Sequence, residues 1–173
     1  LKDLNDPDNP RYRHPFISCM ACGPRYTIID RLPYDRENTA MIDFPMCDFC
    51  NGEYTDRQDR RYHAQTISCH HCGPQLKVYG GSEEKEAAIA KAIALLKEDK
   101  IIAVKGVGGY NFIASPFSEK AVADLRALKG REEKPFAVMF YDEAQVREYC
   151  FMTPEERALL NSSARPIVLL ETK

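Results

Sequence analysis

The residues with the clearest chemistry in this sequence are six cysteines within residues 1–79, which form three Cys-x-x-Cys pairs. In chain order the pairs are Cys19 and Cys22, Cys47 and Cys50, and Cys69 and Cys72. A two-residue spacer lets both sulfurs of one turn face the same ion, and two such pairs roughly 15 to 20 residues apart are a signature of tetrahedral zinc. Eighteen residues separate the second pair from the third, so we predict a structural zinc ion bound by these two pairs. The alternative is a set of buried or disulfide-bonded thiols, but the sequence shows no secretory signal that would support disulfide bonds.

A repeat of 50 residues underlies this spacing. Arg11, Tyr12 and the matched residues of segment 17–24 recur as Arg61, Tyr62 and segment 67–74. The same shift places the counterparts of the second pair immediately upstream of residue 1, so we expect a longer parent chain in which the first pair is half of a first zinc site. The alternative joins the first and second pairs in one site and leaves the third unpaired; the repeat favours the former arrangement.

Other residues around the pairs are expected to have structural roles. Gly23 and Gly73 follow the first and third pairs, where a tight backbone suits a residue that tolerates positive φ. His70 and His71 lie inside the third pair and are expected to be solvent-facing spacers. His14 and His63 are expected to act in packing and hydrogen bonding, and no residue is assigned as catalytic.

Composition excludes several classes of protein. The chain has 173 residues, of which 44% are hydrophobic and 29% charged, with a net charge of −2. These values argue against disordered, collagen-like and coiled-coil proteins. No apolar run approaches the roughly 20 residues that cross a bilayer, and no signal peptide is visible, so we expect a cytoplasmic protein without a membrane partner. Residues 1–79 carry ten basic and eleven acidic residues, whereas nucleic-acid-binding modules show a basic face, so a nucleic-acid partner is not expected.

The second half of the chain has a different pattern, and the turn at residues 79–82 separates the two regions. We therefore predict two domains, an irregular zinc-finger region at residues 1–79 and a mixed α/β (α+β) region at residues 80–173, in which helices cover a twisted sheet. Helices are expected at 83–99 with Ser82 as N-cap, after Ser118, at 142–149 and after Thr153, where Thr153–Glu156 forms a capping box; strands are expected at 101–105, 110–114, 136–140 and 166–170.

Two segments of this region carry groups that suit a phosphate ligand. Lys105 precedes a glycine-rich turn made by Gly106, Val107, Gly108 and Gly109, whose backbone N–H groups are able to cradle an anion, although a plain hairpin turn fits equally well. Lys129, Arg131 and Lys134 surround a loop after a helix and offer three cations to a triphosphate. The alternative interpretation of these three cations is a solvated helix end, where positive side chains lie near the negative end of the helix dipole.

Over its whole length the chain resembles the hydrogenase maturation carbamoyltransferases, the HypF family. In the cysteine-rich half the resemblance rests on Asp8-x-x-Arg11-Tyr12-x-His14-Pro15-Phe16-x-x-Cys19-x-x-Cys22 with residues 23–28, and on segments 32–36 and 59–65. In the second half it rests on segment 104–109 and on Lys129-Gly130-Arg131-x-x-Lys134 with residues 135–139.

The resemblance implies most of a paired zinc-finger region and the first part of a YrdC-like domain, set between an acylphosphatase-like and a Kae1-like domain of a longer enzyme. Members of the family hydrolyse carbamoyl phosphate, activate the carbamate with ATP, and pass the carbamoyl group to the C-terminal cysteine of the partner protein HypE. That group becomes a cyanide ligand of the nickel–iron hydrogenase centre. The implied cofactors are structural Zn²⁺ and, as substrate of the parent enzyme, ATP with Mg²⁺; the fragment alone is expected to be inactive.

The resemblance also implies roles for the cationic segments. Lys129 and Arg131 correspond to the Lys-x-Arg motif that contacts nucleotide phosphates, with Lys134 as a further contact, while Lys105 and the glycine-rich turn correspond to the wall of the carbamoyl-adenylate pocket. One departure is Ala114-Ser115-Pro116, where the family usually has Cys-Asp-Ala, which removes an acidic side chain. Two alternatives remain: a relative of threonylcarbamoyl-adenylate synthases, which generally lack the fingers, and a zinc-stabilised binding module without catalytic activity.

Overall fold

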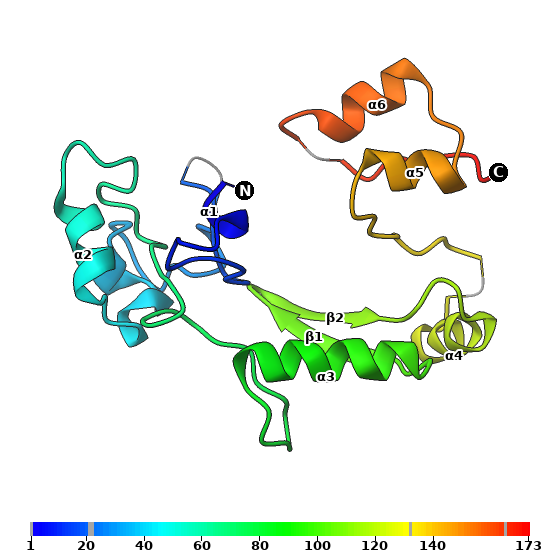
Figure 1. The fold of residues 1–173 in the computed structure, drawn as a ribbon, viewed down its shortest axis with the longest axis horizontal. Helices are drawn as coiled ribbons and strands as arrows, with labels where there is room; N and C mark the ends of the chain where they lie inside the picture. The colour runs from blue at the N-terminus through cyan, green and yellow to red at the C-terminus, as the bar shows by residue number, and fades with distance from the viewer. Residues whose placement is uncertain (1, 21–22, 132, 165) are drawn as a thin grey trace. The chain divides into compact units, whose positions relative to one another are not determined.

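The computed structural model describes residues 2–20, 23–131, 133–164 and 166–173 (Figure 1). The chain divides into two compact units, Leu1–Leu125 and Arg126–Lys173, each with its own internal packing. Among the described residues, no helix combines the length and the apolar character that a membrane crossing requires.

The cysteine-rich part of the first unit contains little regular structure. Its helices are α1 (Lys2–Asn5) and α2 (Asp48–Thr55), with two 3₁₀ turns, η1 (Arg36–Asn38) and η2 (Ala40–Asp43), between them. Cys50, Ile67 and Cys69 form its buried cluster, and Met46 and Tyr54 pack on that cluster. Two of the three side chains at the centre are therefore thiols, as expected for a region that a metal ion holds together.

The repeat seen in the sequence is also a repeat of backbone hydrogen bonds. The matching bonds, each shifted by 50 residues, run from Gly23 N to Cys19 O and from Gly73 N to Cys69 O (2.8 Å each), and from Arg13 N to Leu4 O (2.9 Å) and His63 N to Tyr54 O (3.0 Å). Arg13 and His63 also share positive φ values of 56° and 52°. The two copies consequently follow the same path from a helix end into a cysteine knuckle.

Gly23 and Gly73 are required in the knuckles for a reason other than the predicted one. Neither has the positive φ that the sequence suggested. A Cβ atom at Gly23 would lie 2.5 Å from the carbonyl oxygen of Cys19, and one at Gly73 would lie 2.6 Å from Cβ of Ser68. Close approach of the chain to itself, rather than backbone dihedral, therefore excludes a side chain at both positions.

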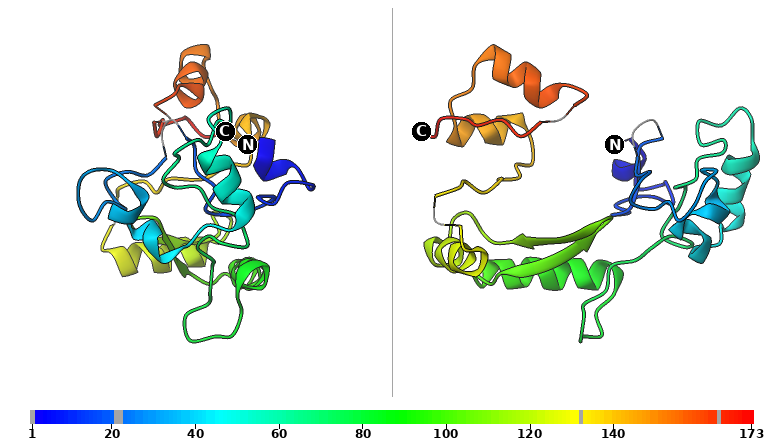
Figure 2. Two further views of the ribbon diagram at one scale, coloured as in Figure 1. Left: turned by 90° about the vertical axis from the view of Figure 1, so that its left-hand side faces the viewer. Right: turned by 180° about the vertical axis from the view of Figure 1, so that it is seen from behind.

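The remainder of the first unit is a helix beside a hairpin. Helix α3 (Lys85–Lys97) runs alongside strands β1 (Ile102–Gly106) and β2 (Gly109–Ile113), as Figures 1 and 2 both show. The strands are antiparallel, with Ile102 opposite Ile113 and Gly106 opposite Gly109. The prediction of a helix, a strand, a glycine turn and a second strand is confirmed, each within two or three residues.

The start of α3 differs from the prediction. Its N-cap is Glu84 rather than Ser82, and no side chain caps it. Residues 76–85 instead form a small turn, in which Val78 N donates to the Glu83 carbonyl (2.9 Å) and Lys85 N to that of Leu76 (2.8 Å). These hydrogen bonds within the turn occupy the residues that the sequence assigned to the start of the helix.

Helix α4 (Glu119–Lys129) begins in the first unit and ends in the second, which also contains α5 (Glu143–Tyr149) and α6 (Pro154–Asn161). Ser118 caps α4 by accepting a hydrogen bond from the N–H of Ala121 (3.2 Å). The capping box of α6 is present as predicted, with Thr153 Oγ1 accepting from Glu156 N and Glu156 accepting from Thr153 N.

The strands predicted at 136–140 and 166–170 are not formed. A strand needs a neighbouring strand to satisfy its backbone groups, and within the described residues β1 and β2 are the only paired strands. Met139 and Ile167 in these segments are 96% and 80% exposed. The fold class of an irregular metal-binding region followed by an α/β region with a small sheet is nonetheless confirmed.

Helices α3 and α4 end in the same hydrogen-bonded motif. In each, one of the first two residues after the helix has positive φ, and the N–H of the residue that follows it returns to a carbonyl five residues earlier. The bonds are Asp99 N to Leu96 O (3.2 Å) and Lys100 N to Leu95 O (3.0 Å) for α3, and Gly130 N to Ala127 O (3.2 Å) and Arg131 N to Arg126 O (3.1 Å) for α4. The left-handed residue is Asp99 (φ 59°) in one and Gly130 (φ 57°) in the other.

Because the left-handed residue is aspartate in one motif and glycine in the other, we predict that substitutions at the two positions change stability in opposite directions. Gly130→Ala is expected to lower the free energy of unfolding by about 1 kcal/mol, because a side chain is strained in the left-handed region. Asp99→Gly is expected to raise it by about 0.5 kcal/mol, because the same strain is relieved and a negative charge leaves the helix C-terminus. Urea unfolding followed by circular dichroism measures both; a change of the same sign in the two variants would contradict the motif.

Candidate metal centre

The second and third cysteine pairs converge on one point. Cys47 is the N-cap of α2 and Cys50 lies in its first turn, while Cys69 and Cys72 belong to the knuckle that Gly73 closes. The four Sγ atoms lie within 4.8 Å of one another, with 3.7 Å between those of Cys47 and Cys69 and 3.8 Å between those of Cys69 and Cys72. Four zinc–sulfur bonds of about 2.3 Å give a tetrahedron with edges of about 3.8 Å. The cluster therefore fits a zinc ion, and the pairing predicted from the repeat is confirmed.

Burial and hydrogen bonding give these thiols different acidities. Burial raises the pKa of the Cys50 and Cys69 thiols above the ordinary value. Burial acts in the same direction on Cys72, but hydrogen bonds with the backbone of Cys47 and Cys69 and with the thiols of Cys50 and Cys47 lower its pKa to about 7. Because a metal binds the thiolate, ion binding must release protons from the buried members of the cluster.

A buried ionic network surrounds the cluster. Arg11 is 1% exposed and pairs with Glu53, and Arg61 pairs with both Glu53 and Asp3. Burial opposes the charge of Arg11, but the hydrogen bonds and charge of Glu53 raise its pKa. Burial likewise acts to raise the pKa of Asp3, but Arg61 and Arg60 hold it below its usual value. These charges are retained because each meets an opposite charge at hydrogen-bond distance.

A second guanidinium, that of Arg36, braces the segment leading to the third pair. Its Nη1 donates to the carbonyl oxygens of Gln65 (2.8 Å) and Ile67 (3.0 Å), and its Nη2 donates to that of Phe44 (2.6 Å). Burial lowers the pKa of Arg36, while the charges of Cys72 and Cys50 act in the opposite direction. Arg36 thus brings positive charge close to sulfur atoms that become anionic when they bind a metal.

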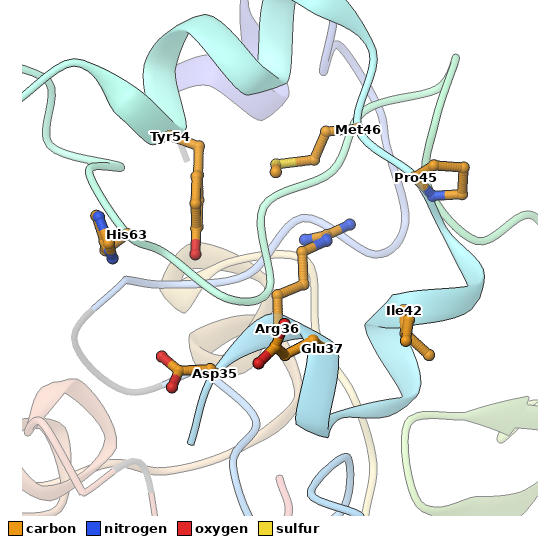
Figure 3. Close-up of a pocket in the computed structure, with 8 residues that line it drawn as sticks. All are labelled: Asp35, Arg36, Glu37, Ile42, Pro45, Met46, Tyr54 and His63. Carbon is orange, nitrogen blue, oxygen red and sulfur yellow. The ribbon is translucent and has the colours of Figure 1, made fainter. Parts of the chain in front are cut away.

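Arg36 also lines an open pocket of about 490 Å³ (Figure 3). Figure 3 shows its guanidinium extending from η1 toward Met46. The pocket is lined by Asp35, Arg36, Glu37, Ile42, Pro45, Met46, Tyr54 and His63. Since the Arg36 donors already bind backbone carbonyls, the side chain supports the wall of the pocket.

His14 and His63 have the packing and hydrogen-bonding contacts that were predicted for them, whereas His70, expected to be a solvent-facing spacer, is half-buried and hydrogen-bonded. His14 is fully buried and its Nε2 lies 3.2 Å from Ser68 Oγ, while His70 Nε2 lies 2.7 Å from the carbonyl oxygen of Tyr12. His63 stacks on Tyr54 with ring centroids 5.1 Å apart. None of them joins the metal-binding cluster found among the described residues.

Cys19 of the first pair is not among the four residues of this cluster. Cys19 is exposed, and Cys22 lies outside the described residues. The assignment of this pair to a separate first metal site therefore stays a prediction.

The glycine-rich segment after Lys105 forms the turn of the β1–β2 hairpin. Gly108 has a φ of 98°, and a Cβ atom there would lie 3.2 Å from Cγ2 of Thr27. Lys105 lies over the ring of Tyr110, 5.9 Å from its centroid. The hairpin alternative is thus what the backbone forms, and the anion-binding role of Lys105, Gly106, Gly108 and Gly109 stays a prediction.

The cations after α4 surround its C-terminal motif. Gly130 turns the chain back, so Arg131 and Arg126 lie over the same Phe136 ring, at 5.7 and 4.9 Å from its centroid. Arg126 also donates to the carbonyl oxygens of Arg131 (3.1 Å) and Lys134 (3.2 Å) and so closes the loop. Lys129, Arg131 and Lys134 are therefore gathered at one helix end, where their phosphate contacts stay a prediction.

Comparison with known proteins matches two segments of the chain to two different families. The HypF finger family matches residues 1–29 and 46–79, and the Sua5/YciO/YrdC family, described as "Telomere recombination", matches residues 94–173. The carbamoyltransferase HypF of Rhodobacter capsulatus is 44% identical over 164 residues, and HypF2 of Cupriavidus necator is 44% identical over 176 residues. The chain belongs to the HypF carbamoyltransferase family.

Solved HypF structures share the fold as well as the sequence. A crystal structure of full-length HypF in a phosphate- and nucleotide-bound form matches 99% of the chain with a TM-score of 0.87 at 48% identity, and that of T. kodakarensis HypF matches 99% with a TM-score of 0.88 at 46%. The matches to the two curated relatives span 94% and 100% of this chain but only 22% of each relative. The matches to the two solved structures span 23% of each solved chain. It therefore corresponds to the HypF finger and the start of the YrdC-like domain.

Sequence reasoning missed the buried ionic network of the HypF finger. Arg11, Glu53 and Arg36 were not assigned any role, although Arg11 and Arg61 are matched residues of the repeat. Asp3 and Glu53 are also 50 residues apart, and both are acidic. These charged residues recur with the 50-residue repeat. That recurrence was the signal in the sequence that could have indicated an ionic interface between the two copies.

Removal of one ligand tests the metal centre. Cys50→Ala is expected to abolish tight zinc binding, because three thiolates leave the ion open to exchange and a buried position empty. Cys150→Ser is the matched control, since Cys150 is also buried but lies outside the cluster. Zinc content after gel filtration measures the effect; equal zinc in the Cys50→Ala variant and the control would contradict the assignment.

The buried His14 predicts a pH dependence of stability. Burial, together with the charges of His70 and Arg11, lowers the pKa of His14 from 6.5 to about 4. The unfolded chain therefore binds more protons than the folded chain between these two values, and stability is lost as the pH falls through this window. From pH 7.5 to pH 5 the loss from this residue is about 1 to 2 kcal/mol.

The His14→Phe variant isolates this contribution. It is expected to be less stable than the parent at pH 7.5, because it loses the contact with Ser68 Oγ, but the gap should narrow toward pH 5. Urea unfolding of both chains, with zinc content checked at each pH, measures the difference. A gap that stays constant across the range would mean that His14 does not titrate on unfolding.

Proposed function

We propose that this chain is the zinc-finger and nucleotide-binding part of an enzyme that uses carbamoyl phosphate and ATP to carbamoylate the C-terminal cysteine of a HypE-type maturation protein. The carbamoyl group then serves as the precursor of a cyanide ligand in nickel–iron hydrogenase. The observation that carries this proposal is 44% identity to carbamoyltransferases HypF over nearly the whole chain. A cytoplasmic location is part of the same proposal.

The chemistry explains why such an enzyme needs ATP. Hydrolysis of carbamoyl phosphate gives carbamate and phosphate, and carbamate is a poor acyl donor because its leaving group would be an oxide. Attack of a carbamate oxygen on the α-phosphorus of ATP releases pyrophosphate and forms carbamoyl adenylate. A cysteine thiolate then attacks the carbamoyl carbon and releases AMP. Both the pyrophosphate and the phosphate of AMP are anionic leaving groups that cations and N–H donors stabilise.

The predicted phosphate contacts are supported by the end of α4. Gly130 and the bonds made by Arg126 hold Lys129, Arg131 and Lys134 around one loop. Arg131 offers paired N–H donors to a phosphate, whereas the two lysines offer point charges. Lys105 with Gly106, Gly108 and Gly109 is proposed to line the carbamoyl-adenylate site, and Mg²⁺ would arrive with ATP and bridge its phosphates.

The cysteine-rich region has a supporting role in this proposal. Residues 1–79 are assigned as the tandem zinc-finger domain and residues 80–173 as the start of the YrdC-like domain. The four-cysteine centre binds structural zinc, because all four positions of the tetrahedron are occupied by protein sulfurs and none is left for substrate. The isolated chain is proposed to be inactive in carbamoyl transfer.

One alternative is supported by a specific observation. The match of residues 94–173 to the Sua5/YciO/YrdC family also fits a threonylcarbamoyl-adenylate synthase relative. Adenylation is common to both reactions, but the HypF finger match and the four-cysteine centre favour the carbamoyltransferase. A purely structural zinc module is the alternative for residues 1–79.

The nucleotide contacts are tested in the full-length enzyme that carries this sequence. Lys129→Ala and Arg131→Ala are each expected to lower carbamoyl-phosphate-dependent ATP–pyrophosphate exchange by at least tenfold, because a charge-assisted phosphate contact is worth about 1.5 to 3 kcal/mol. Lys97→Ala is the control, since Lys97 lies in the last turn of α3. Zinc content should be unchanged in all three. Exchange that survives in the Lys129 and Arg131 variants would leave these cations as helix-end residues only.

A further inference from the structure

The side chain of Arg11 crosses from one copy of the repeat into the other. Arg11 belongs to the first copy, but among the described residues the polar partners of its side chain belong to the second: Nε donates to the carbonyl oxygen of Ser68 (2.8 Å), Nη1 to Glu53 Oε1 (3.2 Å), and Nη2 to Glu53 Oε2 and to Cys50 Sγ (3.3 Å). The side chain also lies over the ring of Phe49, 5.0 Å from its centroid. Only 1% of the surface of Arg11 is exposed, so protein atoms enclose its side chain.

The contact with Cys50 places a fixed cation on one metal ligand. Cys50 is fully buried, so no water is available to stabilise a negative sulfur there. Four thiolates around a divalent zinc ion carry a net charge of −2, and this charge is costly in a buried site unless donors and cations surround it. An N–H donor at 3.3 Å from sulfur is at a normal distance for such a bond, since sulfur is larger than oxygen.

Arg61, the counterpart of Arg11, provides an internal comparison. It is also buried and also binds Glu53, with 3.3 Å between Nη1 and Oε1, and its other ionic partner is Asp3. Within the described part of the chain, no hydrogen bond to a cysteine sulfur is found for Arg61, whereas Arg11 has one. The two arginines therefore share the ionic network and differ in the contact with the metal ligand.

We propose that Arg11 is a positioning residue of the metal centre: its guanidinium stabilises the Cys50 thiolate and orients α2, so that metal retention in the second copy of the repeat depends on a side chain of the first. The inference rests on the proposed zinc ion. Groups that hydrogen-bond to metal ligands commonly change metal affinity by 10- to 100-fold. The copies are thus coupled through the ion as well as through their packing.

The test compares Arg11→Met with Arg61→Met in the 173-residue chain. Both variants remove a buried cation from Glu53, but only Arg11→Met removes the donor to sulfur. Zinc affinity is measured by competition with a chromophoric chelator, and the sulfur-to-metal charge-transfer band is recorded after replacement of zinc by Co²⁺. A hydrogen bond lowers the energy of the sulfur lone pairs, so its loss should move this band to longer wavelength.

For Arg11→Met we expect zinc affinity to fall by 10- to 100-fold, the cobalt band to shift to longer wavelength, and alkylation of the zinc-bound thiolates by iodoacetamide to become faster. For Arg61→Met we expect the band to stay in place and the affinity to change by less than about threefold, well below the range for a donor to a ligand. Equal losses of affinity with an unmoved band in both variants would reduce Arg11 to a structural ion-pair partner.

A second pair of variants distinguishes loss of the hydrogen bond to sulfur from loss of folding. Arg11→Lys and Arg61→Lys keep a buried cation, but one ammonium group lacks the planar fork that serves Glu53, Ser68 and Cys50 together. The cobalt band is expected to shift for Arg11→Lys alone, and an unshifted band there would overturn the proposal. The metal centre itself is tested separately by the zinc content of the unmutated chain. If that chain bound no zinc, the metal centre would be overturned.

Discussion

The convergence of four sulfurs on one point is the constraint on which the cysteine-rich region depends. The buried cluster of this region contains one aliphatic side chain, Ile67, beside Cys50 and Cys69. Few helical residues surround it, and most of the backbone lies in turns. Such a region buries too little apolar surface to offset the conformational entropy of ordering it. A metal ion bound by α2 and by the knuckle at Cys69 would replace the missing apolar core, because its binding free energy is gained only in the folded arrangement.

The same metal centre determines where the charged residues lie. A tetrathiolate site is anionic, and two guanidiniums from outside both ligand pairs bring positive charge to its sulfurs, those of the buried Arg11 and the half-buried Arg36. Glu53 prevents an excess of positive charge by binding Arg11 and Arg61 together. Arg11 of the first copy reaches Glu53 of the second, and Arg61 of the second reaches Asp3, the counterpart of Glu53, in the first. These two ion pairs are reciprocal between the copies of the repeat.

Features fixed by short stretches of chain were predictable from the sequence, whereas features fixed by distant contacts were not. The cysteine spacing and the 50-residue repeat predicted the pairing of Cys47 and Cys50 with the third pair, and the capping box at Thr153 depends on four consecutive residues. The N-cap at Ser82 is an exception among these local features: it was wrong because residues 76–85 form a turn through hydrogen bonds of their own. The role of Arg11 was not predicted because its sulfur partner lies 39 residues away.

The two regions therefore follow different rules of stability. In the cysteine-rich region ligand geometry is set within α2 and one knuckle, so the site forms from a short piece of chain. The segments around Met139 and Ile167 are apolar but exposed, and apolar side chains gathered on a surface favour contact with further protein. In its relatives the matched segment is about 22% of the whole protein, so in those proteins the remaining chain is available to cover such segments. A region organised by a metal ion would keep its form without that cover.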